Sequence, residues 1–370
     1  MPHRLRAHAS SEAEVIVMLK RKAAQWGLDD GEVGPETALK ELLEHWVEDR
    51  RGQVELQTLR IYTDTARWLS ELAGTLTVDE LRPARIKRLL SEIERSRSAS
   101  AYHHARVALS GALSLAVESD VLQHNPVRSV RRRDLAGAMP VTLTVSQVPT
   151  VRAEILLREG SLRPRIGGSA GALRWTTEVI LGSGLRTAEV LALRMMDFDR
   201  QGGTISVSGT LVDDERWAVV RQDHLKSRAQ ARRIELPQFA IDAIEDALLW
   251  TGRGGTRSLM APLIQGWGPS WIAPRNLRRS LREVRRAPAV VMSLAATGLT
   301  AEDLTPRTFR RTAATLVAAA GKGDLRAAQK LLGHSDMRIT LKHYAGAAYA
   351  TVGSASILED LLGSPRRREP

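Results

Sequence analysis

Cysteine is absent from the 370 residues of this chain. Its absence excludes disulfide bonds, a thiolate nucleophile and zinc sites built on cysteine. The nine histidines show no paired spacing typical of metal ligands, so we expect no metal site. Any catalysis must therefore use hydroxyl, carboxylate, imidazole or cationic side chains.

Long apolar runs are missing as well. No stretch of about 18 apolar residues is present that would span a bilayer, and the N-terminal MPHRLRAHASSEAEV lacks the apolar core of a secretory signal. We therefore expect a soluble cytoplasmic protein with no membrane partner.

Basic side chains outnumber acidic ones by 54 to 42, which gives a formal net charge of +12. This excess favours polyanionic partners, but charge alone leaves ribosomal, membrane-surface and DNA partners open. The length allows two or three domains, and 43% hydrophobic residues suffice for ordinary cores.

Changes in composition divide the first part of the chain. Residues 1–35 form a polar arm with one amphipathic stretch. In residues 36–130 apolar positions recur at helical spacing in four segments, which predicts a small all-α domain. Asn125 before Pro126 is expected to end the last of these helices, because the residue before proline avoids the helical region. The Arg-rich residues 131–144 are typical of a linker between domains.

Residues 145–352 are predicted to form a larger, mainly helical domain with one β-rich insert. The short runs TISVSG (204–209), RWAVVRQ (216–222) and ARRIELP (231–237) predict a three-stranded sheet. Helical patterns resume in residues 239–252, 276–287, 307–321 and 324–333. The predicted fold class is thus mainly α with a small β-sheet (α+β), followed by a tail over residues 353–370.

Three segments gather residues suited to phosphate chemistry: LGSGLRTAEVLALRMMDFD (181–199), TPRTFRRTAATL (305–316) and LLGHSDMRITLKHY (331–344). Their two arginines, histidine and tyrosine strongly resemble, in order and spacing, the C-terminal catalytic domain of tyrosine recombinases, the phage-integrase family. The resemblance covers about residues 36–350. It implies that residues 36–130 are the DNA-clamping core-binding domain and residues 145–352 the catalytic domain.

Arg186 begins a predicted helix after an apolar run. A guanidinium stays charged, and its fork matches two phosphate oxygens, while a helix N-terminus also favours anions. By resemblance Arg186 is the first phosphate-binding arginine, and Glu189 is the acidic residue that orients it. The simpler alternative is a surface ion pair between these two residues.

The second arginine lies in TPRTFRRT, where the family usually carries T-P-H-x-L-R-H-T. Arg310 aligns with the second catalytic arginine, and a solvated basic helix face is the alternative. Arg307 replaces the usual histidine and can donate a hydrogen bond but cannot act as a general base. We therefore expect Arg307 to hold the phosphate, with Arg311 as a further phosphate contact.

The third segment is the most specific. By resemblance His334 donates to a non-bridging phosphate oxygen, and Tyr344, ten residues later, is the nucleophile. A tyrosine in a helix-prone stretch otherwise serves core packing. Tyr349 fits the family spacing less well and is expected to be structural.

The leaving 5′-oxygen needs a proton, which in the family comes from a lysine between two strands. Lys226 in HLKSRAQARRIELP is the candidate for this general acid, with an exposed hairpin lysine as the alternative. Arg228 and Arg232 flank it as expected phosphate contacts. The run Arg131, Arg132 and Arg133 would lie beside the DNA backbone, although such runs are often merely solvated.

The resemblance implies a site-specific, integrase-like recombinase that needs no cofactor, neither metal nor ATP. Its Tyr344 would form a 3′-phosphotyrosyl ester, and strands would be exchanged between two duplexes by a homotetramer on double-stranded DNA. Accessory directionality or DNA-bending proteins are further implied partners, and the nucleoid is the implied location. ILEDLL (357–362) is expected to dock onto the next protomer. Two alternatives stay open: a catalytically impaired DNA-binding relative, suggested by Arg307, and topoisomerase-like relaxation by the same chemistry.

Overall fold

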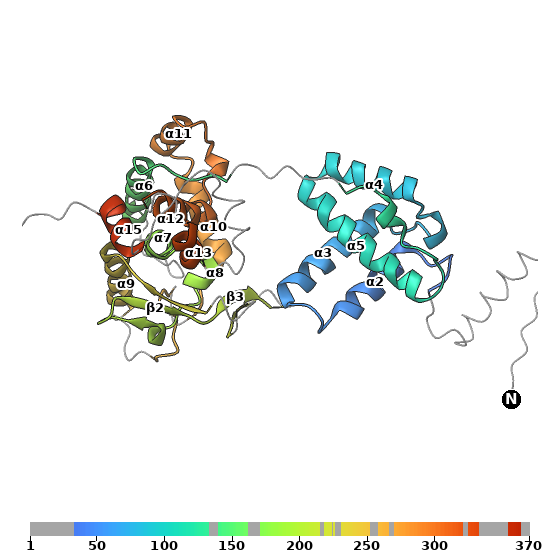
Figure 1. The fold of residues 1–370 in the computed structure, drawn as a ribbon, viewed down its shortest axis with the longest axis horizontal. Helices are drawn as coiled ribbons and strands as arrows, with labels where there is room; N and C mark the ends of the chain where they lie inside the picture. The colour runs from blue at the N-terminus through green and yellow to red at the C-terminus, as the bar shows by residue number, and fades with distance from the viewer. Residues whose placement is uncertain are drawn as a thin grey trace, which may run out of the picture. The chain divides into compact units, whose positions relative to one another are not determined.

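The computed structural model describes residues 33–132, 140–161, 171–214, 218–223, 225, 231–251, 258–265, 270–320, 325–332 and 354–363. The chain divides into two compact units, residues 1–136 and 137–370 (Figure 1). Both are mainly helical, and the second also contains small antiparallel sheets, which confirms the predicted fold class. Within the described ranges, no helix has the length and apolar character needed to cross a membrane.

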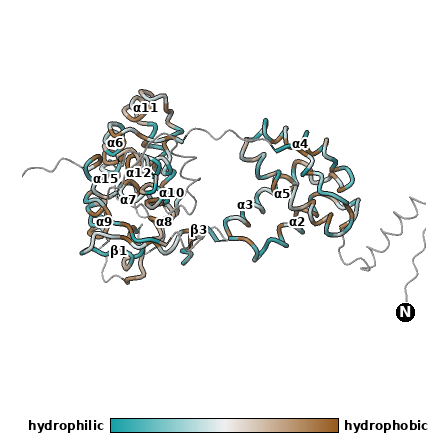
Figure 2. The backbone as a smooth tube through the Cα atoms, in the orientation of Figure 1, coloured by the Kyte–Doolittle hydropathy of each residue, from teal (hydrophilic) through white to brown (hydrophobic). Residues whose placement is uncertain are grey.

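The first unit packs three helices around a fourth. The four are α2 (Leu39–Arg50), α3 (Leu56–Ala73), α4 (Pro83–Ser96) and α5 (Ala99–Glu118). Hydrophilic and hydrophobic residues alternate along them, as amphipathic helices require (Figure 2). Helix α5 contacts each of the other three. Gly111 of α5 lets α2 approach closely, because a Cβ at this position would lie 2.1 Å from Nε1 of the buried Trp46 of α2.

The end of α5 differs from the prediction. The helix stops at Glu118, and Asp120 adopts a positive φ of 56°, whereas we expected the stop at Asn125. Asn125 instead caps the short helix η2 (Pro126–Ser129): its Oδ1 accepts from the Val127 amide at 3.1 Å. Its Nδ2 also donates to the Ser110 carbonyl at 2.8 Å, so the Asn-Pro pair fastens the chain back onto α5.

The second unit is built around α7 (Ala172–Ser183), which is buried along most of its length. Helix α7 contacts several helices (Figure 1). They are α6 (Gln147–Ser161), α8 (Thr187–Val190), α9 (Gln238–Thr251), α10 (Pro274–Val284), α12 (Pro306–Ala320) and α15 (Ser354–Leu362). Helix α11 (Pro288–Ala295) packs on α6, and α13 (Leu325–Leu332) packs on α12. Gly182 lets α9 approach, since a Cβ there would lie 2.6 Å from that of Ala240.

The β-rich insert forms two sheets, so the predicted single three-stranded sheet was wrong. One sheet has the order β1 (Phe198–Asp199), β2 (Thr204–Val207), β5 (Arg232–Glu235). The other is a hairpin of β3 (Thr210–Asp213) and β4 (Val219–Gln222), in which Leu211 faces Arg221. All the strand pairs are antiparallel.

Helix α15 packs on its own chain, against α7 and α12. The docking of ILEDLL onto the next protomer stays a prediction. Ile357, Leu358 and Leu362 are buried in the core of the second unit. Arg152 of α6 donates to the Leu362 carbonyl and forms an ion pair with the largely buried Glu178 of α7. The helix is therefore fastened by apolar burial and by one arginine at its C-terminal end.

Candidate active site

The turn between α7 and α8 carries Arg186. Helix α7 ends at Ser183 and is capped by Gly184, which has a left-handed φ of 63° and donates its amide to the Ile180 carbonyl at 2.8 Å. A Cβ at this position would also lie 2.9 Å from Cγ of Leu331. Glycine is therefore required both by the backbone conformation and by the close approach of α13. Arg186 follows in an extended conformation as the N-cap of α8.

Glu189 holds Arg186 at both its backbone and its side chain. The Arg186 amide donates to Glu189 Oε2 at 2.9 Å, and Nη1 of Arg186 donates to Oε1 at 2.7 Å. The carboxylate is buried, with 2% of its side chain exposed, whereas 42% of the Arg186 side chain is exposed. This asymmetry is not that of a surface ion pair: a buried carboxylate orients a guanidinium that still faces solvent.

Two further arginines converge on the same carboxylate. Nη2 of Arg232 lies 3.2 Å from Oε2 of Glu189, and Nη1 of Arg310 lies 3.9 Å from that oxygen. Burial by itself would raise the pKa of Glu189, but the charges of the arginines outweigh it. Arg232 contributes most, followed by Arg186 with its amide bond and then Arg310, so the pKa of Glu189 lies below its ordinary value. Glu189 therefore remains ionised at neutral pH.

Arg310 of α12 is buried and links the ends of two other helices. Its Nη1 donates to the Gly184 carbonyl at 2.5 Å, and its Nη2 donates to the Leu332 carbonyl at 2.9 Å. Arg310 thus ties the end of α7 to the end of α13, two residues before His334. The structure brings Arg186, Glu189, Arg232 and Arg310 together, although they are up to 124 residues apart in sequence.

The remaining arginines of α12 lie near the surface. Arg307, in the first turn of the helix, is exposed, and Arg311 is partly buried. Thr308 fixes this turn, because its hydroxyl accepts from the Thr305 amide at 3.1 Å and donates to the Asp303 carbonyl at 2.7 Å. The first turn of α12 thus presents Arg307 to solvent while Arg310 faces inward.

Other expected site residues are placed only in part. Arg131 and Arg132 are exposed and line a cavity of about 710 Å³ in the first unit, together with Lys87 and Tyr102. The expected positions of Lys226, Arg228, Arg133, His334 and Tyr344 lie outside the described residues.

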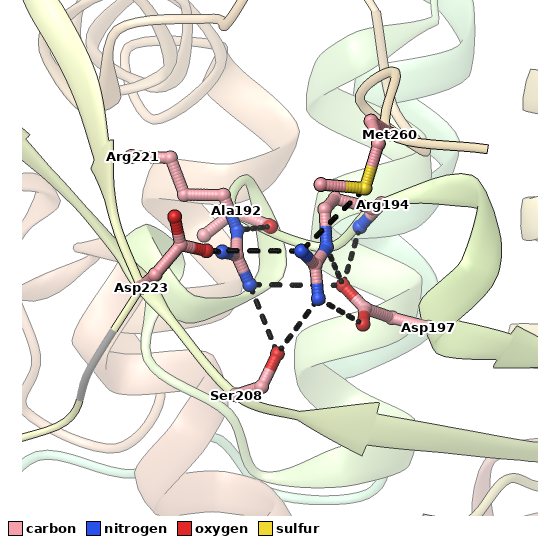
Figure 3. Close-up of polar contacts among 7 residues, drawn as sticks. All are labelled: Ala192, Arg194, Asp197, Ser208, Arg221, Asp223 and Met260. Carbon is pink, nitrogen blue, oxygen red and sulfur yellow. Dashed lines mark hydrogen bonds and ion pairs between the residues drawn. The ribbon is translucent and has the colours of Figure 1, made fainter. Parts of the chain in front are cut away.

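One polar cluster was missed by the sequence analysis. It comprises Arg194, Asp197, Ser208, Arg221 and Asp223, and it lies beside the segment that follows α8 (Figure 3). The i, i+3 spacing of Arg194 and Asp197 within LRMMDFD was a usable signal, but nothing in the sequence assigned Arg221 to them. Among the described residues, no group of three or more His, Asp or Glu could hold a metal ion.

Comparisons with known proteins point to one family. The model of the phage integrase family matches residues 169–351. A tyrosine recombinase XerC from Myxococcus xanthus is 24% identical over 306 residues, which cover 80% of this chain and 83% of that protein. Tyrosine recombinase XerC of Pelobacter propionicus is 30% identical over 167 residues, or 45% of each chain.

Solved structures share the fold. The Tn1549 transposon integrase in complex with transposon right end DNA has a TM-score of 0.66 at 20% identity, covering 88% of this chain and 100% of that one. A lambda integrase dimer bound to a COC′ core site has a TM-score of 0.58 at 13% identity, covering 94% and 91%. With Arg186, Glu189 and Arg310 in the expected order, residues 169–351 belong to the phage integrase family of tyrosine recombinases.

Proposed function

We propose that this protein is a site-specific DNA recombinase that cleaves and rejoins strands through a 3′-phosphotyrosyl intermediate. The observation that carries the proposal is the buried carboxylate of Glu189, which orients Arg186 and neighbours Arg310. A phosphodiester resists attack because its oxygens are negative, and fixed guanidinium groups offset the charge that grows in the transition state. The arginines are oriented before DNA binds, so little reorganisation is needed at the moment of reaction.

The reaction would follow from these roles. The Tyr344 hydroxyl oxygen attacks phosphorus, the bond from phosphorus to the 5′-oxygen breaks, and Lys226 gives that oxygen its proton. The phenolic proton passes to water or to another group, because Arg307 cannot accept it. His334, Arg186 and Arg310 bind the non-bridging oxygens. The reverse attack by a 5′-hydroxyl of the partner strand releases Tyr344, so the ester conserves the bond energy and neither ATP nor a metal is consumed.

The relatives support DNA as the partner and an oligomer as the acting form. Integrases of this fold have been solved with DNA, as a dimer on a core site and as a tetramer on a Holliday junction. By analogy we propose a homotetramer that joins two duplexes. Accessory proteins that bend DNA or set direction would fit this scheme as additional partners.

Covalent capture tests the function. The protein is incubated with DNA flanking its own gene, the mixture is denatured with detergent, and DNA-linked protein is detected. We expect an adduct that is lost in Tyr344→Phe and kept in Tyr349→Phe. Loss in Tyr349→Phe alone would overturn the assignment of the nucleophile.

Arg307 favours one alternative, a relative that binds DNA without cutting it. In that case the wild type would bind duplex DNA in a salt-sensitive manner and give no adduct. Arg307→His would then restore the adduct on the same DNA. Relaxation of plasmid DNA that lacks any specific site would instead favour the topoisomerase-like alternative.

A further inference from the structure

The cluster of Arg194, Asp197, Ser208, Arg221 and Asp223 joins two parts of the second unit (Figure 3). Arg194 is the N-cap of the short helix η3 (Met195–Asp197), which follows the turn after α8, and Asp197 is the last residue of that helix. Ser208 lies between β2 and β3, Arg221 is in β4, and Asp223 comes directly after that strand. The cluster therefore connects the segment that begins at Arg186 with the β3–β4 hairpin.

Arg194 binds both Asp197 and Ser208 in this cluster. Its amide and its Nε donate to Asp197 Oδ2 at 2.8 and 3.1 Å, and its Nη2 donates to Oδ1 at 3.0 Å. Nη2 also donates to the Ser208 hydroxyl at 3.3 Å. Only 14% of the Arg194 side chain and 6% of the Asp197 side chain are exposed. The fork of Arg194 and the carboxylate thus form a rigid, buried pair.

Arg221 is held against this pair from the hairpin. Its Nε donates to the Ala192 carbonyl at 2.8 Å and its Nη2 donates to the Ser208 hydroxyl at 2.9 Å. Nη2 also lies 3.8 Å from Asp197 Oδ2, and only 6% of the side chain is exposed. Gly209 leaves the space for it, since a Cβ there would lie 2.7 Å from the Arg221 guanidinium carbon.

The arrangement costs free energy that apolar side chains would not cost. Two guanidinium groups share one buried carboxylate, Asp197, and the second carboxylate, Asp223, is 72% exposed. Burying ions in this way is often no more stable than replacing them with well-packed apolar residues. A gain in positional specificity rather than stability is therefore the better explanation for such a cluster.

The hairpin leads directly to the expected general acid. Beyond Arg221 and Asp223, Leu225 packs against the core of the second unit, and Lys226 is the next residue in the chain. On the far side, β5 begins with Arg232, which is bound to Glu189. Buried arginines thus fasten both ends of the connection that contains Lys226 to the segment that contains Arg186.

We propose that Arg221, supported by Arg194 and Asp197, is a positioning residue that fixes where strand β4 delivers the chain to Lys226. Its role is to align that general acid with a phosphate bound at Arg186. The inference rests on the function proposed above, and specifically on Lys226 as the proton donor. Only 6% of the Arg221 side chain is exposed, so we expect it to act through Lys226 rather than on the substrate.

A substrate that needs no general acid tests the proposal. Two duplexes are compared at the mapped cleavage site, one with the ordinary 5′-bridging oxygen and one with sulfur in its place. A thiol has a pKa of about 8.5, so the sulfur leaves as a thiolate without taking up a proton. Loss of the general acid should therefore no longer slow cleavage. Single-turnover cleavage is measured at saturating protein for wild type, Lys226→Ala and Arg221→Gln. Arg200→Gln is the matched control, because Arg200 is 73% exposed and pairs with Glu245 at the surface.

We expect Arg221→Gln to cleave the oxygen substrate at least about tenfold more slowly than wild type, and the sulfur substrate within about threefold of it. Lys226→Ala should show the same pattern and Arg200→Gln no defect. Equal slowing of Arg221→Gln on both substrates, or no slowing on oxygen, overturns the proposal.

A second variant at Arg221 and the Lys226→Ala control separate misfolding and a wrong proton donor from a failure of positioning. If Arg221→Gln loses its cooperative thermal transition, Arg221→Lys takes its place, since it retains the charge but lacks the Nε donor to Ala192. Rescue of Arg221→Lys by sulfur supports positioning, and its absence overturns it. If sulfur fails to rescue Lys226→Ala, Lys226 is not the acid and the inference fails with it. The recombinase function is tested separately, by the presence or absence of the Tyr344 adduct.

Discussion

Arg310 Nη1 lies 2.5 Å from the carbonyl oxygen of Gly184, two residues before Arg186. Through this bond α12 determines the position of the turn that presents the first arginine. Because the second Arg310 nitrogen holds the Leu332 carbonyl, one buried guanidinium organises the end of α7 and the end of α13 together. Arg310 therefore has a structural role as well as the catalytic role proposed for it.

Substitution of Arg310 should abolish most cleavage even where charge is conserved. Arg310→Lys keeps one positive charge but cannot reach the Gly184 and Leu332 carbonyls with a planar fork. We expect its rate of adduct formation to fall by about 10² or more, the loss seen when one fixed donor to a transition state is removed. A rate within about threefold of wild type, with the fold intact by circular dichroism, would contradict the assignment.

Glu189→Gln should destabilise the protein in a pH-dependent way. The folded pKa of Glu189 lies below its ordinary 4.5, so its contribution is fully present above pH 4.5 and is lost as the pH falls through the folded pKa. At pH 7 we expect a loss of about 3–5 kcal/mol, because three arginines lose a buried counter-charge. Urea unfolding of both proteins between pH 7 and pH 3 measures the difference, which should shrink towards acid. A difference that grows towards acid would refute the shift.

The sequence patterns predicted helices well where an apolar face repeats over several turns. Residues 307–321 were predicted as a helix, and α12 spans Pro306–Ala320. The strand β3 was missed because its sequence runs into Asp213 and Asp214, which are typical of a turn. In the structure Nη1 of Arg275 forms an ion pair with Oδ1 of Asp213 at 2.7 Å. The two residues are 62 positions apart in the sequence, so no local pattern indicates this pair.

The candidate site was predictable to the extent that it follows family motifs. Arg186, Glu189 and Arg310 were predicted as site residues because their spacing is distinctive, whereas Arg221 was not predicted because its partners are distant in sequence. Ser208 and Ala192 lie 13 and 29 residues away from it, and they meet Arg221 only because the β3–β4 hairpin packs near α8. Contacts between residues that are distant in the sequence produce no periodic pattern from which they could be predicted.

Leu358→Ala should reveal whether α15 is docked on its own chain in solution. Leu358 is fully buried in the core of the second unit, so the substitution leaves a cavity and should cost about 2–5 kcal/mol. Leu361→Ala on the same helix is the control, since Leu361 is 36% exposed. Thermal unfolding of the unassociated protein distinguishes them. Equal, small effects of both substitutions would show that the helix leaves this position.

Arg131 and Arg132 should contribute to DNA affinity through charge alone. Both are exposed, so replacing them with glutamine should leave stability unchanged and weaken binding to any duplex similarly. If the protein neutralises about 8 phosphates, the logarithm of affinity falls with the logarithm of salt at a slope near −7. The double variant should reduce that slope by about 2, as fluorescence anisotropy at several salt concentrations would measure. An unchanged slope would mean that these arginines are merely solvated.

Arg307→His should add a titrating group to the site. Arg307 is exposed on the first turn of α12, three residues before Arg310, and as an arginine it can only donate. An imidazole in its place titrates near pH 6.5 and can accept the phenolic proton when neutral. We therefore expect cleavage by the variant to rise with pH between about 5.5 and 7.5, and to exceed the wild-type rate at the upper end. Arg307→Gln separates the loss of charge from the gain of a base, because it should be slow at every pH. A pH profile for Arg307→His that parallels that of Arg307→Gln would show that the residue at 307 takes no part in proton transfer.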